Sequence, residues 1–155
     1  MVQPIPQGYN TVSCHLVVPN SVQALEFYRK AFGAEETFRM PGPDGQSTVH
    51  AEMRLGNSMV MLSDENPQWA QKSPQTLGGT SVSLHLYLED VDAVFNRAVE
   101  AGCEVIMPLQ DMFWGDRFGE LKDPFGHVWS LATRKEDVSW EEMQRRAAEV
   151  FSQGG

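Results

Sequence analysis

Two histidines occupy the same place in two copies of one short pattern, Ser-x-His-Leu. Ser13 and His15 belong to the first copy, and Ser83 and His85 lie 70 residues further along the chain. Imidazole changes charge near neutral pH and is a frequent metal ligand. Each copy reads as a strand that runs into a helix, and a unit repeated at constant offset predicts two similar modules whose shared residues face a common site.

A second matched pair of side chains accompanies the histidines. Glu52 and Glu120 each lie on the predicted third strand of a module, on the face opposite their apolar neighbours. Residues two apart on a strand project from the same face, so the serine and histidine of each copy also point the same way. The repeat therefore predicts one polar surface in each module.

The hydrophobic periodicity predicts the elements that position these residues. In the first half we expect a strand at 12–18, a helix at 21–32 and strands at 35–40, 48–55 and 58–63. The second half repeats this order, with a strand at 82–88, a helix from 91 to Gly102, and strands at 103–109, 118–122 and 127–133. A loop is expected at 110–117, and a capping box at 139–142 begins a tail helix.

This order predicts an α+β fold with two βαβββ modules. We expect a single domain over residues 1–135, with modules at about 11–64 and 81–133 joined by a connector at 65–80, and a helical tail at 136–155. A chain of 155 residues is long enough to bury a core without disulfide bridges. Cys14 and Cys103 lie among apolar residues and are expected to be buried, reduced thiols.

Charge and composition narrow the possible partners. The net charge of −9 and the pI near 4.8 argue against a nucleic-acid interface, which needs a basic surface. No signal peptide or apolar run long enough to cross a membrane is present, so we expect a soluble, cytoplasmic protein without a membrane partner. Acidity favours, more weakly, cationic ligands.

Two motifs extend the pattern to a known family. The run LEFYRKAFG at 25–33 follows the first strand, and DPFGH at 123–127 precedes the last. With two βαβββ modules, these motifs resemble the vicinal oxygen chelate superfamily, which holds glyoxalases, extradiol dioxygenases, fosfomycin resistance enzymes and bleomycin resistance proteins. The run FWGDRFG at 113–119 resembles its PhnB-like branch. Over about residues 10–135, the resemblance implies a cupped mixed sheet around a cavity, helices outside, and a homodimer.

The resemblance also locates the positions of a metal centre. Metal-dependent members carry ligands on the first and last strands of each module, and the motifs place those positions at Ser13, Met61, Ser83 and Ser130. Hydroxyls and a thioether are poor partners for a hard divalent cation, which prefers carboxylate or imidazole ligands. We therefore expect no metal cofactor at the usual place.

Three interpretations of the two histidines and two glutamates stay open. They can hydrogen-bond within the cavity wall as structural groups. They can line a ligand pocket, where Glu recognises a cationic or hydroxyl group and His donates or accepts a proton. They can also form a displaced centre from His15, His85 and one of Glu52 and Glu120, which would suit one divalent transition metal such as zinc, iron or nickel.

Other side chains are candidates for the cavity wall. Trp114, beside Phe113 in the expected loop, is either an aromatic lid over the cavity or an anchor at a subunit interface. Met59 and Met61 would form an adaptable wall. Arg117 is placed with the cavity residues, although it can also pair with Asp116.

The sequence thus predicts a metal-free small-molecule binding protein that holds an apolar or cationic ligand between its modules. No catalytic residue is assigned, and the ligand is not identified. The predicted cavity residues are Ser13, His15, Glu52, Met59, Met61, Ser83, His85, Trp114, Arg117, Glu120 and Ser130. The alternative is a metal-dependent lyase, isomerase or dioxygenase in which the displaced ion polarises substrate oxygen atoms and Glu52 or Glu120 is the general base.

Overall fold

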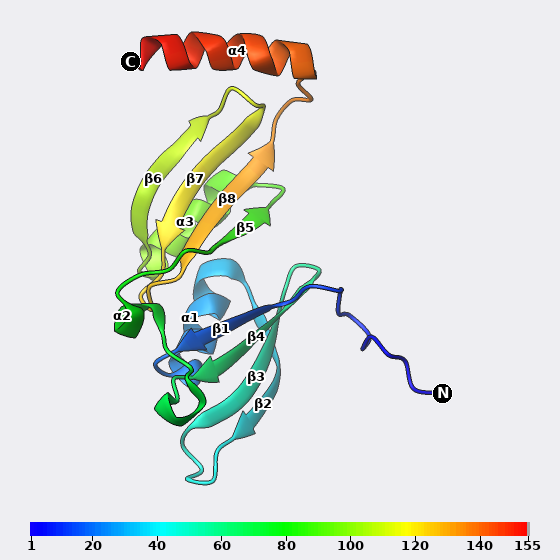
Figure 1. Cartoon of the computed structure of the whole chain (residues 1–155), viewed down its shortest axis with the longest axis vertical. Coiled ribbons are helices and arrows are strands. Elements are labelled where there is room, and N and C mark those ends of the chain that lie inside the picture. Colours follow the sequence, from blue (N-terminus) through cyan, green and yellow to red (C-terminus); the bar gives the residue numbers. More distant parts are fainter. Residues whose placement is uncertain (155) are drawn as a thin grey trace.

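Two copies of one βαβββ module follow each other along the chain and lie end to end (Figure 1). The computed structural model describes residues 1–154. Module 1 contains β1 (Cys14–Val18), α1 (Ser21–Phe32), β2 (Glu35–Pro41), β3 (Thr48–Leu55) and β4 (Ser58–Asp64). Module 2 contains β5 (Ser83–Tyr87), α3 (Val91–Ala101), β6 (Glu104–Asp111), β7 (Asp116–Lys122) and β8 (Val128–Arg134). The predicted α+β fold is confirmed.

The connector and the tail add short elements. A 3-10 turn, η1 (Pro67–Trp69), and a one-turn helix, α2 (Pro74–Leu77), lie between the modules. Helix α4 (Trp140–Gln153) follows module 2 and lies beyond the tips of its strands (Figure 1). No helix within residues 1–154 is both long enough and apolar enough to cross a membrane.

Each module forms its own four-stranded mixed sheet. The strand orders are β1-β4-β3-β2 and β5-β8-β7-β6, with the first strand of each module parallel to its last. Paired residues on neighbouring strands project from the same face of a sheet. The strand register therefore produces one row of neighbouring side chains in each sheet, and the two rows occupy matching positions. These rows are His15, Met61, Glu52 and Phe38 in module 1, and His85, Ser130, Glu120 and Met107 in module 2.

Helices α1 and α3 pack against each other and cover one face of the two sheets. Asn20 caps α1 by accepting a hydrogen bond from the amide of Gln23 at 3.0 Å, and Gly33 ends the helix with φ of 73°. Such a positive φ is accessible to glycine without steric cost. The helices bury small residues such as Ala31 and Ala98, which lets their backbones approach closely.

The buried carboxylate of Asp123 in module 2 is hydrogen-bonded to α1 of module 1. Asp123, in the turn before β8, accepts hydrogen bonds through Oδ2 from the Tyr28 hydroxyl at 2.6 Å and from Trp129 Nε1 at 2.9 Å. Its Oδ1 accepts from the amides of Phe125 at 2.9 Å and His127 at 3.0 Å. The motif that supported the family resemblance therefore has a structural role at the module interface.

The hairpin between β6 and β7 is tighter than the sequence suggested. We expected a loop over 110–117, but Gln110 pairs with Phe118 and Asp111 with Arg117, which leaves four residues in the turn. Gly115 has φ of 104°, and a Cβ atom there would lie 2.6 Å from the carbonyl oxygen of Glu136. The close approach of these two backbone segments requires glycine.

Candidate functional site

The sheet faces opposite α1 and α3 carry the polar rows. On β1, Leu16 and Val18 are buried while His15 is exposed, and β2 is exposed along its whole length. The alternation that buries every second residue therefore places His15, Met61 and Glu52 on the open face of module 1. His85, Ser130 and Glu120 occupy the corresponding face of module 2.

A cluster of ionisable side chains forms on the open face of module 1. His50 Nε2 lies 3.2 Å from Glu52 Oε1, an interaction that becomes an ion pair when the imidazole is protonated. The rings of His15 and His50 are nearly parallel, with centroids 6.3 Å apart. The partial loss of hydration on the sheet face, and then the neighbouring His50, lowers the pKa of His15 below its usual 6.5. His15 is therefore neutral at physiological pH.

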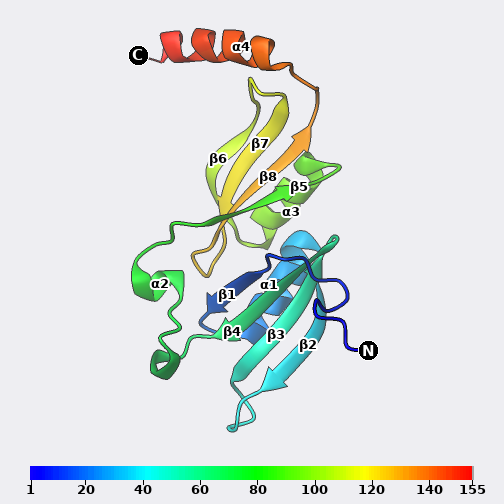
Figure 2. The same cartoon turned by 45° about the vertical axis from the view of Figure 1, so that its right-hand side comes forward.

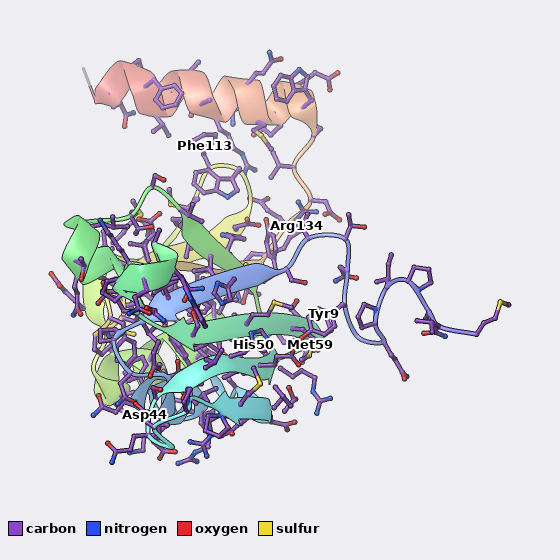
Figure 3. All side chains as sticks on the ribbon, turned by 60° about the horizontal axis from the view of Figure 1, so that its bottom comes forward. Tyr9, Asp44, His50, Met59, Phe113 and Arg134 are labelled. Carbon is purple, nitrogen blue, oxygen red and sulfur yellow. The ribbon has the colours of Figure 1, made fainter. Side chains whose placement is uncertain are left out.

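The N-terminal arm, residues 1–11, adds Tyr9 to this cluster. Figure 3 shows Tyr9, His50 and Met59 near the same part of module 1. The Tyr9 hydroxyl is buried close to Glu52, although no partner within residues 1–154 meets it in well-aligned hydrogen-bond geometry. Burial, followed by the Glu52 carboxylate, raises the pKa of Tyr9 to about 12. Tyr9 and then His50 hold the pKa of Glu52 below 4.5, against the opposing effect of burial.

The arm and the sheet line an open concave site of about 510 Å³, which we call the arm hollow. Its wall is mostly apolar and includes Pro4, Ile5, Pro6, Tyr9 and Met61, with the carboxylate of Glu52 among them. The arm leads into β1 at one end of module 1, and its first residues extend away from the strands (Figure 1 and Figure 2). An apolar wall with a few polar groups is typical of small-molecule sites.

A second concave site, the seam hollow, lies where the two modules meet. It has a volume of about 230 Å³ and is lined by Ser13 and Met59 of module 1 and by Ser83 and His85 of module 2. Ser13 also lines the arm hollow, so the two hollows adjoin. Residues of both modules thus contribute to one continuous surface.

The open face of module 2 is more aromatic. His85 Nδ1 lies 2.6 Å from the Ser130 hydroxyl. The His85 ring also packs against Tyr87 and Phe118, with centroids 4.6 Å and 6.0 Å away. Glu120 lies beside Ser130 in the register of β7 and β8. The imidazole is held by one hydroxyl and two rings rather than by a carboxylate.

The aromatic loop is held by contacts within the chain. Trp114 Nε1 and the Tyr87 hydroxyl both donate to Asp116 Oδ2, at 3.1 Å and 3.2 Å. Trp114 also packs on Phe118, with centroids 5.7 Å apart. The neighbouring Phe113 turns toward α4 (Figure 3). Trp114 therefore belongs to the aromatic wall of module 2.

Arg117 lies apart from the other predicted cavity residues. It is one residue removed from Asp116 and Phe118 on β7, so it projects from the helix-covered face. Its Nε lies 2.9 Å from Asp92 Oδ2 on α3, and its Nη1 lies 3.3 Å from Asp111 Oδ1. The suggested pair between Arg117 and Asp116 is replaced by these contacts, because adjacent residues of a strand point to opposite faces.

Sequence reasoning missed His50 and Tyr9 as site residues. His50 was recognisable, because it lies two residues before Glu52 and shares its face. Tyr9 gave no signal, because the arm has no periodicity that could place it over the sheet. Within residues 1–154, no group of three or more His, Cys, Asp and Glu side chains is arranged to hold a metal ion. The alternative metal centre considered from the sequence, His15 and His85 with either Glu52 or Glu120, would take its ligands from both sheets.

Known proteins share both the sequence and this architecture. An uncharacterized protein of Mycobacterium tuberculosis is 47% identical over 146 residues, covering 92% of this chain and 84% of the relative. The crystal structure of TioX from Micromonospora superposes with a TM-score of 0.65 at 25% identity, over 81% of this chain and 98% of TioX.

A PhnB protein from Bacillus cereus has the same fold, with a TM-score of 0.59 at 21% identity over 80% of this chain and 99% of its own. The model of the Glyoxalase/Bleomycin resistance protein/Dioxygenase superfamily matches residues 10–131, from the segment before β1 to the middle of β8. The chain belongs to this superfamily.

Proposed function

We propose that the chain is a metal-free small-molecule binding protein of the glyoxalase/bleomycin resistance type. The observation that carries the proposal is the seam hollow, whose wall combines Ser13 and Met59 with Ser83 and His85. The resemblance places metal ligands at the two serine positions, and neutral hydroxyls do not hold a hard divalent cation there. Hydroxyls and an imidazole can instead donate or accept hydrogen bonds with an organic ligand.

The size and chemistry of the two adjoining hollows support this function. Their volumes of about 230 Å³ and about 510 Å³ suit a compound of modest size. Methionine side chains, such as Met59 and Met61, adapt to ligands of different shape because they are unbranched and flexible. The ligand class is therefore an apolar or cationic organic compound.

Within the superfamily, we infer that the chain belongs to the PhnB-like branch. The run FWGDRFG at 113–119 supports this assignment, together with the shared fold of the PhnB protein described above. In this chain Trp114 and Asp116 of that run are hydrogen-bonded to each other. The motif thus supports the aromatic wall of module 2.

Native mass spectrometry of untagged protein taken directly from cells tests the proposed function. We expect a bound organic compound, and we expect it to bind about tenfold more weakly to a His85→Ala variant, as the loss of one hydrogen bond implies. A Lys122→Ala variant, at the exposed end of β7, is the matched control. A stoichiometric transition metal that disappears in the His15→Ala, His85→Ala double variant would instead support the metal-dependent alternative.

The proposal includes a homodimer, with α4 in the contact. Helix α4 contains no buried residue, and Trp140 and Phe151 are 69% and 71% exposed. Its charged residues include Glu141, Glu142 and Glu149 against two arginines, a balance that does not favour an anionic membrane. A second copy of the chain would cover the exposed apolar side chains of α4, Trp140 and Phe151. Sedimentation velocity should show a dimer that a Trp140→Ser, Phe151→Ser variant dissociates, and a wild-type monomer at micromolar concentration would contradict this assignment.

A further inference from the structure

We propose that the arm hollow recognises a protonated organic amine with an apolar substituent. This inference rests on the proposed function, since it names the chemistry of the ligand at one end of the joined hollows. Three observations on the open face of module 1 carry it: the charge on Glu52, the apolar wall around that charge, and the position of Tyr9.

Glu52 carries a negative charge that its surroundings leave poorly compensated. Its pKa lies below 4.5, so the carboxylate is ionised at neutral pH. Within residues 1–154, His50 is the basic side chain at ion-pair distance from it, and no lysine or arginine lies within 4 Å. A carboxylate in an apolar setting gains free energy when a cation approaches, because little water screens the two charges.

A ligand can reach this carboxylate. The side chain of Glu52 is 23% exposed. It lines the arm hollow together with apolar residues such as Pro6 and Met61 and with the polar residues Asn10, Thr11 and Ser13. Proline and methionine offer apolar contact but no hydrogen bond donor to a carboxylate. The complementary ligand therefore supplies N–H donors at one end and apolar surface at the other. A protonated amine has both, and the acidic chain, with net charge −9, attracts cations over a longer range.

Tyr9 contributes in two ways from the arm. Its hydroxyl is buried beside Glu52 and lowers the pKa of the carboxylate. Tyr9 is also one of the residues that line the hollow, so its aromatic ring lies close to the space that a ligand would fill. The face of an aromatic ring attracts an ammonium group through its quadrupole. The arm thus places an aromatic residue next to an ionised carboxylate.

Module 2 contains an internal comparison for this site. Glu120 has the same place in its row as Glu52, with Ser130 and Met107 on either side instead of Met61 and Phe38. The N-terminal arm precedes β1 and contributes lining residues beside Glu52, whereas β5 of module 2 is preceded by the connector. Glu120 is therefore the matched control for the charge on Glu52.

The test compares 2-phenylethylamine with 2-phenylethanol, which has nearly the same shape but no charge at pH 7.5. Binding to the full-length protein is measured by calorimetry and by NMR of ¹³C-methyl methionine, with the Met61 methyl reporting on the arm hollow. We expect the amine to bind at least about tenfold more tightly than the alcohol. Glu52→Gln should abolish that preference, and Glu120→Gln should retain it.

Two further variants separate the roles of Tyr9. Tyr9→Phe keeps the ring and should change the amine affinity by less than about threefold, because Glu52 stays ionised at pH 7.5 without the hydroxyl. Tyr9→Ala removes the ring and should weaken binding more strongly. Unfolding midpoints close to that of the wild type would show that the variants are folded.

Equal binding of amine and alcohol would overturn the inference and leave the proposed function standing, since the hollow would still bind a small molecule. An amine preference that survives Glu52→Gln would also overturn it. Failure of the amine to bind at millimolar concentration would contradict the inference, while an organic compound retained in native mass spectrometry would still support the proposed function.

Discussion

Two carboxylates at opposite faces of the sheets differ in how fully they are hydrogen-bonded. Asp123 is buried and accepts four hydrogen bonds, from two side chains and two backbone amides. Glu52 lies on the open face, near a tyrosine hydroxyl and one imidazole, in an apolar hollow. A carboxylate whose acceptor sites are occupied holds the fold together, whereas one with few partners is available to a ligand.

The largest expected effect on stability comes from removing the buried, fully hydrogen-bonded carboxylate of Asp123. Asp123→Ala would leave the Tyr28 hydroxyl and Trp129 Nε1 buried without an acceptor, at a cost of about 1–3 kcal/mol for each donor. We expect the free energy of unfolding in urea to fall by about 3 kcal/mol or more. Glu52→Gln is the control and should change it by less than about 0.5 kcal/mol. A similar loss of unfolding free energy in both variants would contradict the different roles given to Asp123 and Glu52.

A milder substitution, Tyr28→Phe, also tests the structural role of Asp123. Tyr28→Phe removes one donor to Asp123 but keeps the packed ring, so the free energy of unfolding should fall by about 1–2 kcal/mol. Combining it with Asp123→Ala should add less than the single effects predict, because both residues belong to one hydrogen bond. Strict additivity in a double-mutant cycle would show that the hydroxyl acts independently of the carboxylate.

His15 on the open face of module 1 should make the stability of the protein depend on pH. The pKa of His15 is lowered in the folded protein from 6.5, so the unfolded chain binds a proton more readily just below that pH. Stability contributed by this group is therefore lost as the pH falls below about 6.5. His15→Gln should make the urea midpoint less sensitive to pH between 7.5 and 5.5. An identical pH profile in wild type and variant would contradict the shift.

The smallest expected effect concerns Glu52 itself. Tyr9→Phe removes the hydroxyl that contributes most to the low pKa of Glu52, so that pKa should rise toward 4.5. NMR titration of the side-chain carboxyl carbon measures the change directly. The free energy of unfolding at pH 7 should stay within about 0.5 kcal/mol of the wild type. An unchanged pKa would mean that Tyr9 and Glu52 do not interact.

Local patterns predicted most of the fold. The caps at Asn20 and Asp90 and the glycines at 33 and 102 set the ends of α1 and α3 where the sequence placed them. The 70-residue repeat also placed His15 and His85 at matching positions of two sheets. Such signals are local, because capping and alternation depend on residues a few positions apart.

The site was less predictable because its composition depends on contacts between distant segments. Tyr9 reaches Glu52 across the sheet from an arm without periodicity. Arg117 was assigned to the cavity by its position in a motif, but strand alternation turns it toward Asp92. The length of the turn at 112–115 was set by pairing between β6 and β7, which composition alone does not specify.

The separation of the two sheets has a consequence for how a substitution in one module affects the other. The modules are joined through α1, α3 and the Asp123 turn, and their sheets share no hydrogen-bonded ladder. Substitutions on the outward surface of one module can thus leave the joint between the modules intact. The rows that contain Glu52 and Glu120 accordingly give two modules of the same architecture chemically distinct surfaces.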